Sequence, residues 1–228
     1  ELVRMDKALG TLFARLKKLG MSESTAVILT SDHGMTPYWG ETRLPDIVSE
    51  FAKAGLEAVF VESGEKAPSY ADVVLATNGT SLQVYFIAEV DPGAVAALQN
   101  SIGRQPYVGG VLSRTELAAL GAHALSGDML IWANPPSHFA AHSVYYGIRA
   151  NHDTLHPSSA HVFMAMGGAG INQGVEVSAP TPIIDVAPTI SQLLGIDAPL
   201  NSSGKILWEA LSTSAEAPRL PADSTEGE

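Results

Sequence analysis

The chain has 228 residues, of which 46% are hydrophobic and 16% charged, so it carries enough apolar side chains to bury a core. The formal net charge of −11 argues against the basic face that a nucleic-acid polymer would need, although metal ions could still hold a small phosphorylated substrate. The absence of cysteine excludes disulfides and thiolate chemistry. The sequence contains no run of 18 apolar residues, so it predicts no membrane-spanning helix.

An amphipathic pattern opens the sequence and predicts a helix over residues 2–19. Its apolar residues recur at spacings of three and four: Leu2, Met5, Leu9, Leu12, Phe13, Leu16 and Leu19. Gly20 suits the C-cap of this helix. Because the sequence starts without Met inside a helical pattern and continues at once into a core strand, we expect it to be the C-terminal part of a longer protein.

A short apolar run, A-V-I-L-T at residues 26–30, predicts a buried strand. Asp32, His33 and Gly34 follow it, at the edge where open α/β sheets bind ligands. A carboxylate and an imidazole are ligands that Zn²⁺ accepts, so this turn is a candidate metal site. The alternative is an ordinary turn, in which Asp32 caps the following backbone and His33 is a surface residue.

Short strands and helices alternate over residues 38–140, which predicts an α+β insertion or cap on a main sheet. We expect helices at 45–53, 91–102 and 115–120, and strands at 56–61, 73–77, 82–87 and 128–133. Asn78 and Gly79 are a strong hairpin signal between two of these strands, and we expect them to serve only as a turn.

Residues 134–161 are predicted as loop and hold five of the seven histidines: His138, His142, His152, His156 and His161. We expect His138 and His142 to be exposed or capping, with a substrate pocket as the alternative, and His123 to lie on the surface. A core strand is predicted at 162–166 and a helix from about Pro188 to Leu194. The composition of residues 212–228 predicts a disordered tail.

Three blocks together resemble the alkaline phosphatase superfamily, in particular its type I phosphodiesterase/nucleotide pyrophosphatase branch. They are TSDHGM (30–35), NHDTLHPSSAHVFMAMGGAGI (151–171) and PTPIIDVAPTISQLLGIDAPLNSSGKIL (180–207), and they occur in the family's order. The resemblance implies an α/β fold in which helices flank a mostly parallel sheet, with residues 1–211 forming the C-terminal portion of the catalytic domain.

The resemblance also implies the site residues. Asp32 and His33 match the family's Asp-His pair, which binds one metal of a two-metal site that holds Zn²⁺, with Mn²⁺ as the alternative. His152 matches the late metal ligand by its distance from His161 at the strand entry, and His156 is the competing assignment. Asp153 stands where the family usually has glycine.

By this resemblance, the parent protein would hydrolyse a small phosphate ester, most simply a diester or pyrophosphate. Two divalent metals would act with a Thr or Ser nucleophile that lies upstream in the family and has no counterpart here, so the missing N-terminal part is the expected partner and the chain alone would be inactive. The alternatives are a phosphotransferase or mutase of the same superfamily, and a non-catalytic metal-binding module. Related enzymes are often exported, but the sequence leaves the compartment open.

Overall fold

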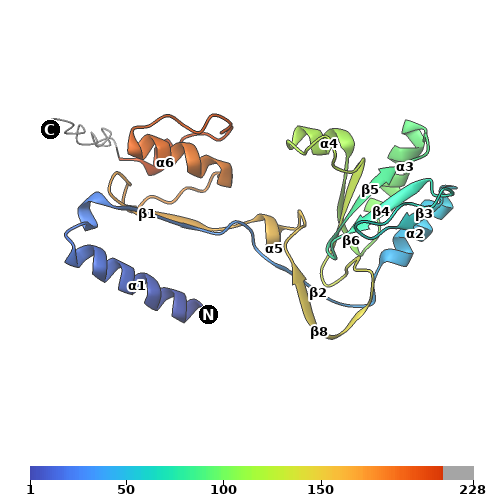
Figure 1. The fold of residues 1–228 in the computed structure, drawn as a ribbon, viewed down its shortest axis with the longest axis horizontal. Coiled ribbons are helices and arrows are strands. Elements are labelled where there is room, and N and C mark those ends of the chain that lie inside the picture. Colours follow the sequence, from blue (N-terminus) through green and yellow to red (C-terminus); the bar gives the residue numbers. More distant parts are fainter. Residues whose placement is uncertain (213–228) are drawn as a thin grey trace, which may run out of the picture. The chain divides into compact units, whose positions relative to one another are not determined.

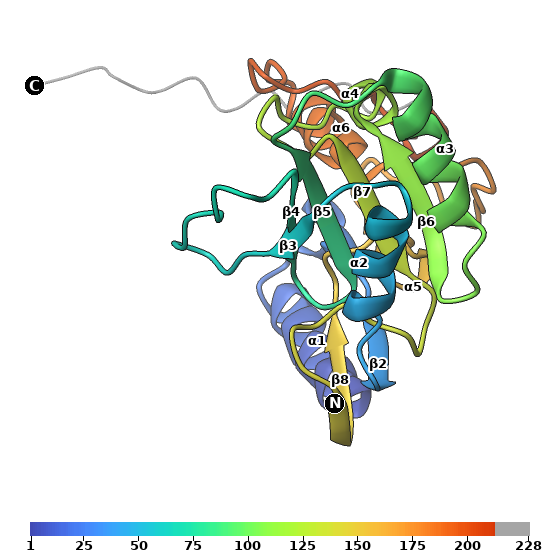
Figure 2. The same cartoon turned by 90° about the vertical axis from the view of Figure 1, so that its right-hand side faces the viewer.

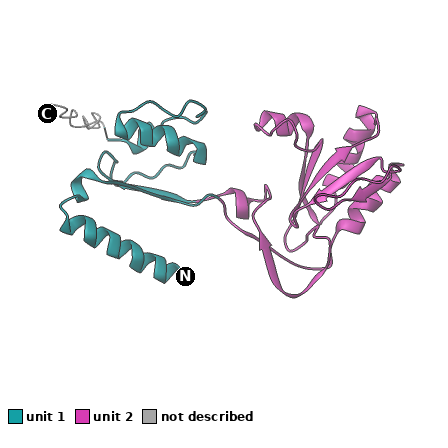
Figure 3. Ribbon diagram, in the orientation of Figure 1, with its two compact units in different colours: residues 1–32, 163–228 teal, residues 33–162 magenta. Residues whose placement is uncertain are grey.

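The computed structural model describes residues 1–212, which form two compact units (Figures 1 and 3). Unit 1 consists of residues 1–32 and the segment from residue 163 onward, and unit 2 consists of residues 33–162. Almost all of the predicted tail lies outside the described residues. Between residues 1 and 212, no helix is long and apolar enough to cross a membrane.

Unit 1 is built around an antiparallel two-stranded ribbon in which Ile28 faces Met166. Its elements are α1 (Leu2–Lys18), a 3-10 turn η1 (Ser22–Ser24), β1 (Ala26–Thr30), β9 (Met164–Gly168), η2 (Ile183–Asp185), α6 (Val186–Leu194) and η3 (Trp208–Ala210). The helix and strand predicted at 2–19 and 26–30 are confirmed, as is the late helix. Gly195 ends α6 in the left-handed conformation that helix C-caps favour (φ 65°).

Helix α1 is amphipathic, yet it buries none of its side chains within unit 1. Seven large apolar residues remain exposed along it and just after it: Leu2, Val3, Met5, Leu12, Phe13, Leu19 and Met21. A groove of about 380 Å³ lies between the helix and the ribbon, with Phe13 and Leu16 on one side and Val27 and Leu29 on the other. The apolar stripe that predicted the helix is therefore present but largely uncovered in unit 1.

Unit 2 holds a five-stranded sheet in the order β3-β4-β5-β7-β6. These strands are β3 (Ala58–Phe60), β4 (Val73–Thr77), β5 (Ser81–Phe86), β6 (Val108–Ser113) and β7 (Met129–Ala133). Helices α2 (Leu44–Lys53), α3 (Pro92–Gly103) and α4 (Arg114–Ala119) connect or follow them, and Figure 2 shows α2 and α3 over one face of the sheet.

Alternating strand residues form the core of unit 2. Val73, Leu75, Leu82, Val84, Met129 and Ile131 are fully buried, and they share a hydrophobic cluster with Ile47, Phe51, Leu98 and Ile102 of the two covering helices. Each such side chain stabilises the fold by about 1.5–3 kcal/mol relative to exposure. Because successive strand residues point to opposite faces, each of these strands directs a row of apolar side chains toward the two helices.

The expected mostly parallel arrangement is not seen among the strand pairs of residues 1–212. Strands β3 and β4 run parallel, whereas the other pairs in this part of the chain run antiparallel. The turn at Asn78 and Gly79 explains one of them, since a tight turn joins only antiparallel neighbours. Gly79 adopts the positive φ of 106° that such a turn needs.

A second antiparallel ribbon, which the sequence did not reveal, pairs β2 (Thr36–Gly40) with β8 (Val144–Asn151). Most of β8 is exposed on both faces, so its sequence lacks the alternation that marks a half-buried strand, and 134–161 was predicted as loop. This ribbon matters for the site, because β2 begins just after His33 and β8 ends just before His152. The assignment of 38–140 as an insertion stays a prediction.

Candidate metal centre

The D-H-G turn spans the boundary between the two units. Asp32 is exposed in the bend that follows β1 and is the last residue of the first segment of unit 1. His33 is half-buried and is the first residue of unit 2. Every contact described below lies within unit 2.

Position 34 requires glycine because the backbone there passes very close to the backbone of Ser158 and Ser159. Its N–H donates to the carbonyl of Ser159 at 2.8 Å, and the N–H of Met35 donates to the carbonyl of Ser158 at 2.9 Å. A Cβ on Gly34 would lie only 2.1 Å from the Ser158 oxygen, which is far inside van der Waals contact. The glycine therefore lets the turn dock against the short helix α5 (Pro157–Ala160). Its φ is not positive, so the reason for glycine here is space and not backbone conformation.

Hydrogen bonds between side-chain hydroxyl groups also hold the D-H-G turn against α5. The buried Thr36 hydroxyl lies 2.6 Å from both the Ser158 and Ser159 hydroxyls. Ser158 in turn bonds through its hydroxyl to Nδ1 of His156 at 2.7 Å, and its N–H donates to the same nitrogen. His156 thus serves as the N-cap of α5, with Nδ1 as the accepting atom.

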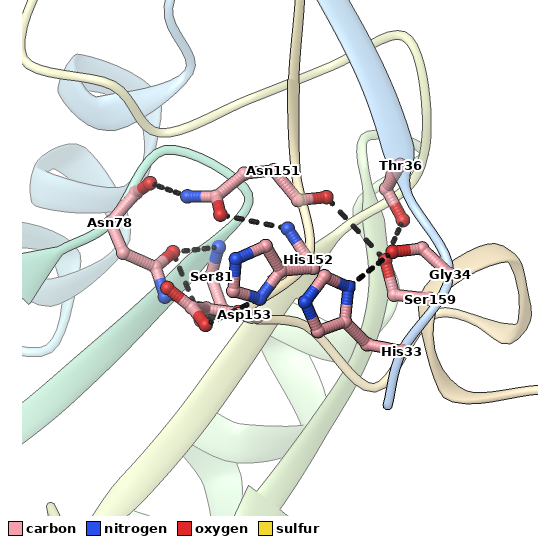
Figure 4. Close-up of polar contacts among 9 residues, drawn as sticks. All are labelled: His33, Gly34, Thr36, Asn78, Ser81, Asn151, His152, Asp153 and Ser159. Atoms are coloured by element: carbon pink, nitrogen blue, oxygen red, sulfur yellow. Dashed lines mark hydrogen bonds and ion pairs between the residues drawn. The ribbon is translucent and has the colours of Figure 1, made fainter. Parts of the chain in front are cut away.

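The rings of His33 and His152 are stacked, with centroids 3.7 Å apart and planes inclined by 12° (Figure 4). Nδ1 of His33 lies 2.8 Å from the carbonyl of Gly34, and Nδ1 of His152 lies 3.1 Å from the carboxylate of Asp153. A carbonyl oxygen can only accept, so Nδ1 of His33 carries a proton. For His152, the nearby Asp153 carboxylate favours a proton on Nδ1. In the neutral ring the lone pair is then on Nε2, which is the tautomer that metal-bound histidines adopt when Nδ1 is hydrogen-bonded.

The remaining histidines have structural or surface positions. His138 is fully buried: its Nε2 donates to the carbonyl of Gly40 at 3.1 Å, and its Nδ1 accepts from the N–H of Ala140 at 3.2 Å. It is therefore a satisfied core histidine and neither exposed nor a pocket residue. His123, His142 and His161 are exposed, as expected for the first two.

Within residues 1–212, no group of three or more His, Cys, Asp or Glu side chains is arranged to hold a metal ion. The structure brings His33 and His152 together. His156 has a different role, because its Nδ1 caps the N-terminus of α5. The assignment of Asp32, His33 and His152 as metal ligands stays a prediction.

Residues 1–101 match the type I phosphodiesterase / nucleotide pyrophosphatase family. This match confirms the family resemblance. No curated protein matches the sequence.

Among solved structures, wild-type alkaline phosphatase PafA is 22% identical with a TM-score of 0.54, over 92% of this chain and 43% of that one. Human ectonucleotide pyrophosphatase/phosphodiesterase 5 is 19% identical with a TM-score of 0.53, over 88% of this chain and 49% of that one. Its murine counterpart, solved as an inactive variant in complex with AMP, is 17% identical with a TM-score of 0.55, over 92% and 51%.

These likenesses confirm the α/β, alkaline-phosphatase-like fold class. This chain spans about half or less of the length of these three structures.

Proposed function

We propose that the protein carrying this chain is a metal-dependent phosphodiesterase or nucleotide pyrophosphatase, in which His33 and His152 bind divalent metal through Nε2 and Asp32 binds through its carboxylate. The family match supports a phosphoester hydrolase in general terms. The observation that carries the metal role is the stacked pair of imidazoles, in which Nδ1 of His33 bonds to the Gly34 carbonyl and Nδ1 of His152 lies beside the Asp153 carboxylate.

The donor chemistry fits a divalent metal. Two neutral imidazoles and a carboxylate are ligands that Zn²⁺ accepts, and Mn²⁺ is the alternative ion. His33 and His152 lie at the same end of the β2–β8 ribbon, where Thr36 pairs with Asn151, so the same local structure positions both. His156 is the weaker candidate, because its Nδ1 is already the acceptor at the α5 N-terminus.

Each residue of the site has a separable task. Gly34 allows the turn to dock, Thr36 and Ser159 fix it against α5, and the Gly34 carbonyl orients His33. Divalent ions at such a site would activate the nucleophile and stabilise the leaving oxygen. The net negative charge of the chain makes a local source of positive charge necessary if a phosphate is to bind there.

We further propose that the site is completed by an N-terminal part of the same protein, which supplies the Thr or Ser nucleophile and the other metal ligands. Two features support this: the three solved structures are about twice as long as this chain or longer, and the apolar face of α1 is uncovered in unit 1. A two-stranded ribbon such as β1–β9 is also marginal in stability without further strands or cover.

The substrate is proposed to be a small phosphate diester or pyrophosphate, and the AMP complex of the murine structure makes nucleotide derivatives the first to try. The test is hydrolysis of bis-p-nitrophenyl phosphate and of a dinucleoside pyrophosphate by the intact parent protein. We expect turnover that a chelator abolishes and Zn²⁺ or Mn²⁺ restores. Metal binding without any turnover would favour the non-catalytic module, and transfer of phosphate to a second substrate would favour the phosphotransferase.

A further inference from the structure

The loop that carries His152 is tied to a distant turn, the one at Asn78. The carbonyl of Asp153 accepts two hydrogen bonds, from the Ser81 hydroxyl at 2.6 Å and from the Asn78 side-chain amide at 3.0 Å (Figure 4). The side-chain amide of Asn151 donates to the carbonyl of Asn78. Residues on both sides of His152 are therefore anchored to the β4–β5 turn.

Both polar atoms of the Asn78 side-chain amide form hydrogen bonds. Its Oδ1 accepts from the N–H of Ser81 at 2.9 Å, which closes the turn, while its Nδ2 donates to Asp153. An aspartate has no donor and a serine has too short a reach, so the amide is the group that can do both. Asn78 thus has a task beyond the turn that its Asn-Gly signal predicted.

His152 is also held by its two sequence neighbours. Its backbone N–H donates to Oδ1 of Asn151 at 2.7 Å, and its Nδ1 lies 3.1 Å from Oδ1 of Asp153. The hydrogen bond to Asn151 fixes the backbone of His152, and the contact with the Asp153 carboxylate orients its ring. A neutral imidazole can carry its proton on either nitrogen, and an acceptor at one of them decides which tautomer is populated.

We propose that Asp153 and Asn78 are positioning residues for His152. Asp153 holds the imidazole as the Nδ1–H tautomer, so that the lone pair lies on Nε2, and Asn78 holds the backbone from which Asp153 acts. The consequence for metal affinity rests on the function proposed above, whereas the consequence for the tautomer does not.

The tautomer is measured by ¹⁵N NMR of the intact, metal-free protein with labelled histidine, at a pH where the imidazole is neutral; a His152→Gln variant identifies the signal. We expect the Nδ1–H form of His152 in the wild type and in Asp153→Asn, whose amide oxygen still accepts. Asp153→Ala is expected to populate both tautomers. The Asp153 side chain is about half exposed, at 51%, so its removal leaves the core intact.

Asp91→Ala is the matched control. Asp91 accepts from the N–H of Ala94 as the N-cap of α3, so its loss destabilises a helix without touching His152. We expect a wild-type His152 tautomer in this variant. If Asp153→Ala also keeps the wild-type tautomer, the positioning role of Asp153 is overturned, whatever the enzyme's activity.

Zn²⁺ titration of the same proteins tests the metal consequence. Loss of a residue that orients a metal-binding histidine typically weakens metal affinity about 10–100-fold. We expect a loss in this range for Asp153→Ala and for Asn78→Ala, and a smaller loss for Asp153→Asn. Unchanged Zn²⁺ affinity in Asn78→Ala would remove that residue from the proposal. A wild-type protein that binds no Zn²⁺ would instead overturn the proposed function while the tautomer result stands.

Discussion

At the scale of single residues, Gly34 is the position where a small change should have a large local effect. A methyl group at this site would lie 2.1 Å from the Ser158 carbonyl, so Gly34→Ala must push the turn away from α5. We expect a loss of about 1–3 kcal/mol in the free energy of unfolding of the intact protein, the usual range for overpacking. Urea denaturation measures it.

Gly10→Ala is the control for that substitution. Gly10 lies inside α1, and a Cβ there would meet nothing within 4 Å. Since alanine favours helix, this variant should be as stable as the wild type or slightly more so. Equal stability of Gly34→Ala and Gly10→Ala would show that the close approach at the D-H-G turn carries no energetic weight.

His138 is the second residue with a sharp prediction, because both of its ring nitrogens are bonded and its ring is fully buried beside Tyr38. His138→Ala leaves a cavity and two unpaired backbone groups. We expect it to lower the free energy of unfolding by about 2–4 kcal/mol.

The exposed His142→Ala should stay within about 0.5 kcal/mol of the wild type. Thermal and urea unfolding compare this variant with His138→Ala. Equal stability of the two variants would contradict the structural role given to His138. The comparison also separates a structural histidine from a surface one within the same histidine-rich segment.

At the scale of elements, helices α2 and α3 are joined by a carboxylate. Glu50 on α2 accepts from the Ser101 hydroxyl of α3 at 2.7 Å and pairs with Lys53 at 2.6 Å. The hydrogen bonds from Lys53 and Ser101 lower the pKa of Glu50 below its usual value. A lowered pKa means that the stabilisation is present above the pKa of the unfolded state and is lost as the pH falls through the folded one.

The prediction is a pH-dependent gap between wild type and Glu50→Gln. The wild type should be the more stable at pH 7, and the difference in free energy of unfolding should shrink steadily as the pH falls below about 4.5, near the ordinary pKa of glutamate. Urea titrations at several pH values measure it. Glu57→Gln, at an exposed position, is the control; a gap that is the same for both variants or independent of pH would contradict the role given to Glu50.

Elements also differ in how well the sequence predicted them. Strands β4, β5 and β7 are short apolar runs, and α1 shows a clear apolar stripe, so the local sequence was enough to predict them. Strand β8 is exposed on both faces and was predicted as loop, although it is the strand that ends at His152. Strands β2 and β8, neither of which was predicted, pair with each other.

At the scale of the whole molecule, the sequence predicted some parts of the candidate site and not others. Asp32 and His33 were named because they follow a predicted strand and match the family's Asp-His pair. His152 was named from the family resemblance, by its distance from His161 at the next strand entry. The supporting contacts could not be predicted: Asn78 is 75 residues from Asp153, and nothing in either local sequence indicates that they meet. The Asp153 pairing with His152 is likewise a matter of ring orientation, which spacing does not encode.

We expect the chain by itself to hydrolyse no phosphodiester, because the proposed site takes its nucleophile and its other metal ligands from an N-terminal part of the protein. The intact parent should do so in a chelator-sensitive way, and co-expression of this chain with the N-terminal part should restore activity if the two fold together. Assays of bis-p-nitrophenyl phosphate hydrolysis compare the three samples. Chelator-sensitive turnover by the isolated chain would contradict the proposed missing part.

The most direct measurement of the central claim is X-ray absorption at the zinc edge of the zinc-loaded intact protein. We expect imidazole nitrogen ligands at about 2.0–2.1 Å, and a fall in their number in His33→Ala and in His152→Ala but not in His142→Ala. Spectra that are identical in all four proteins, each fully loaded with zinc, would show that neither His33 nor His152 binds the metal.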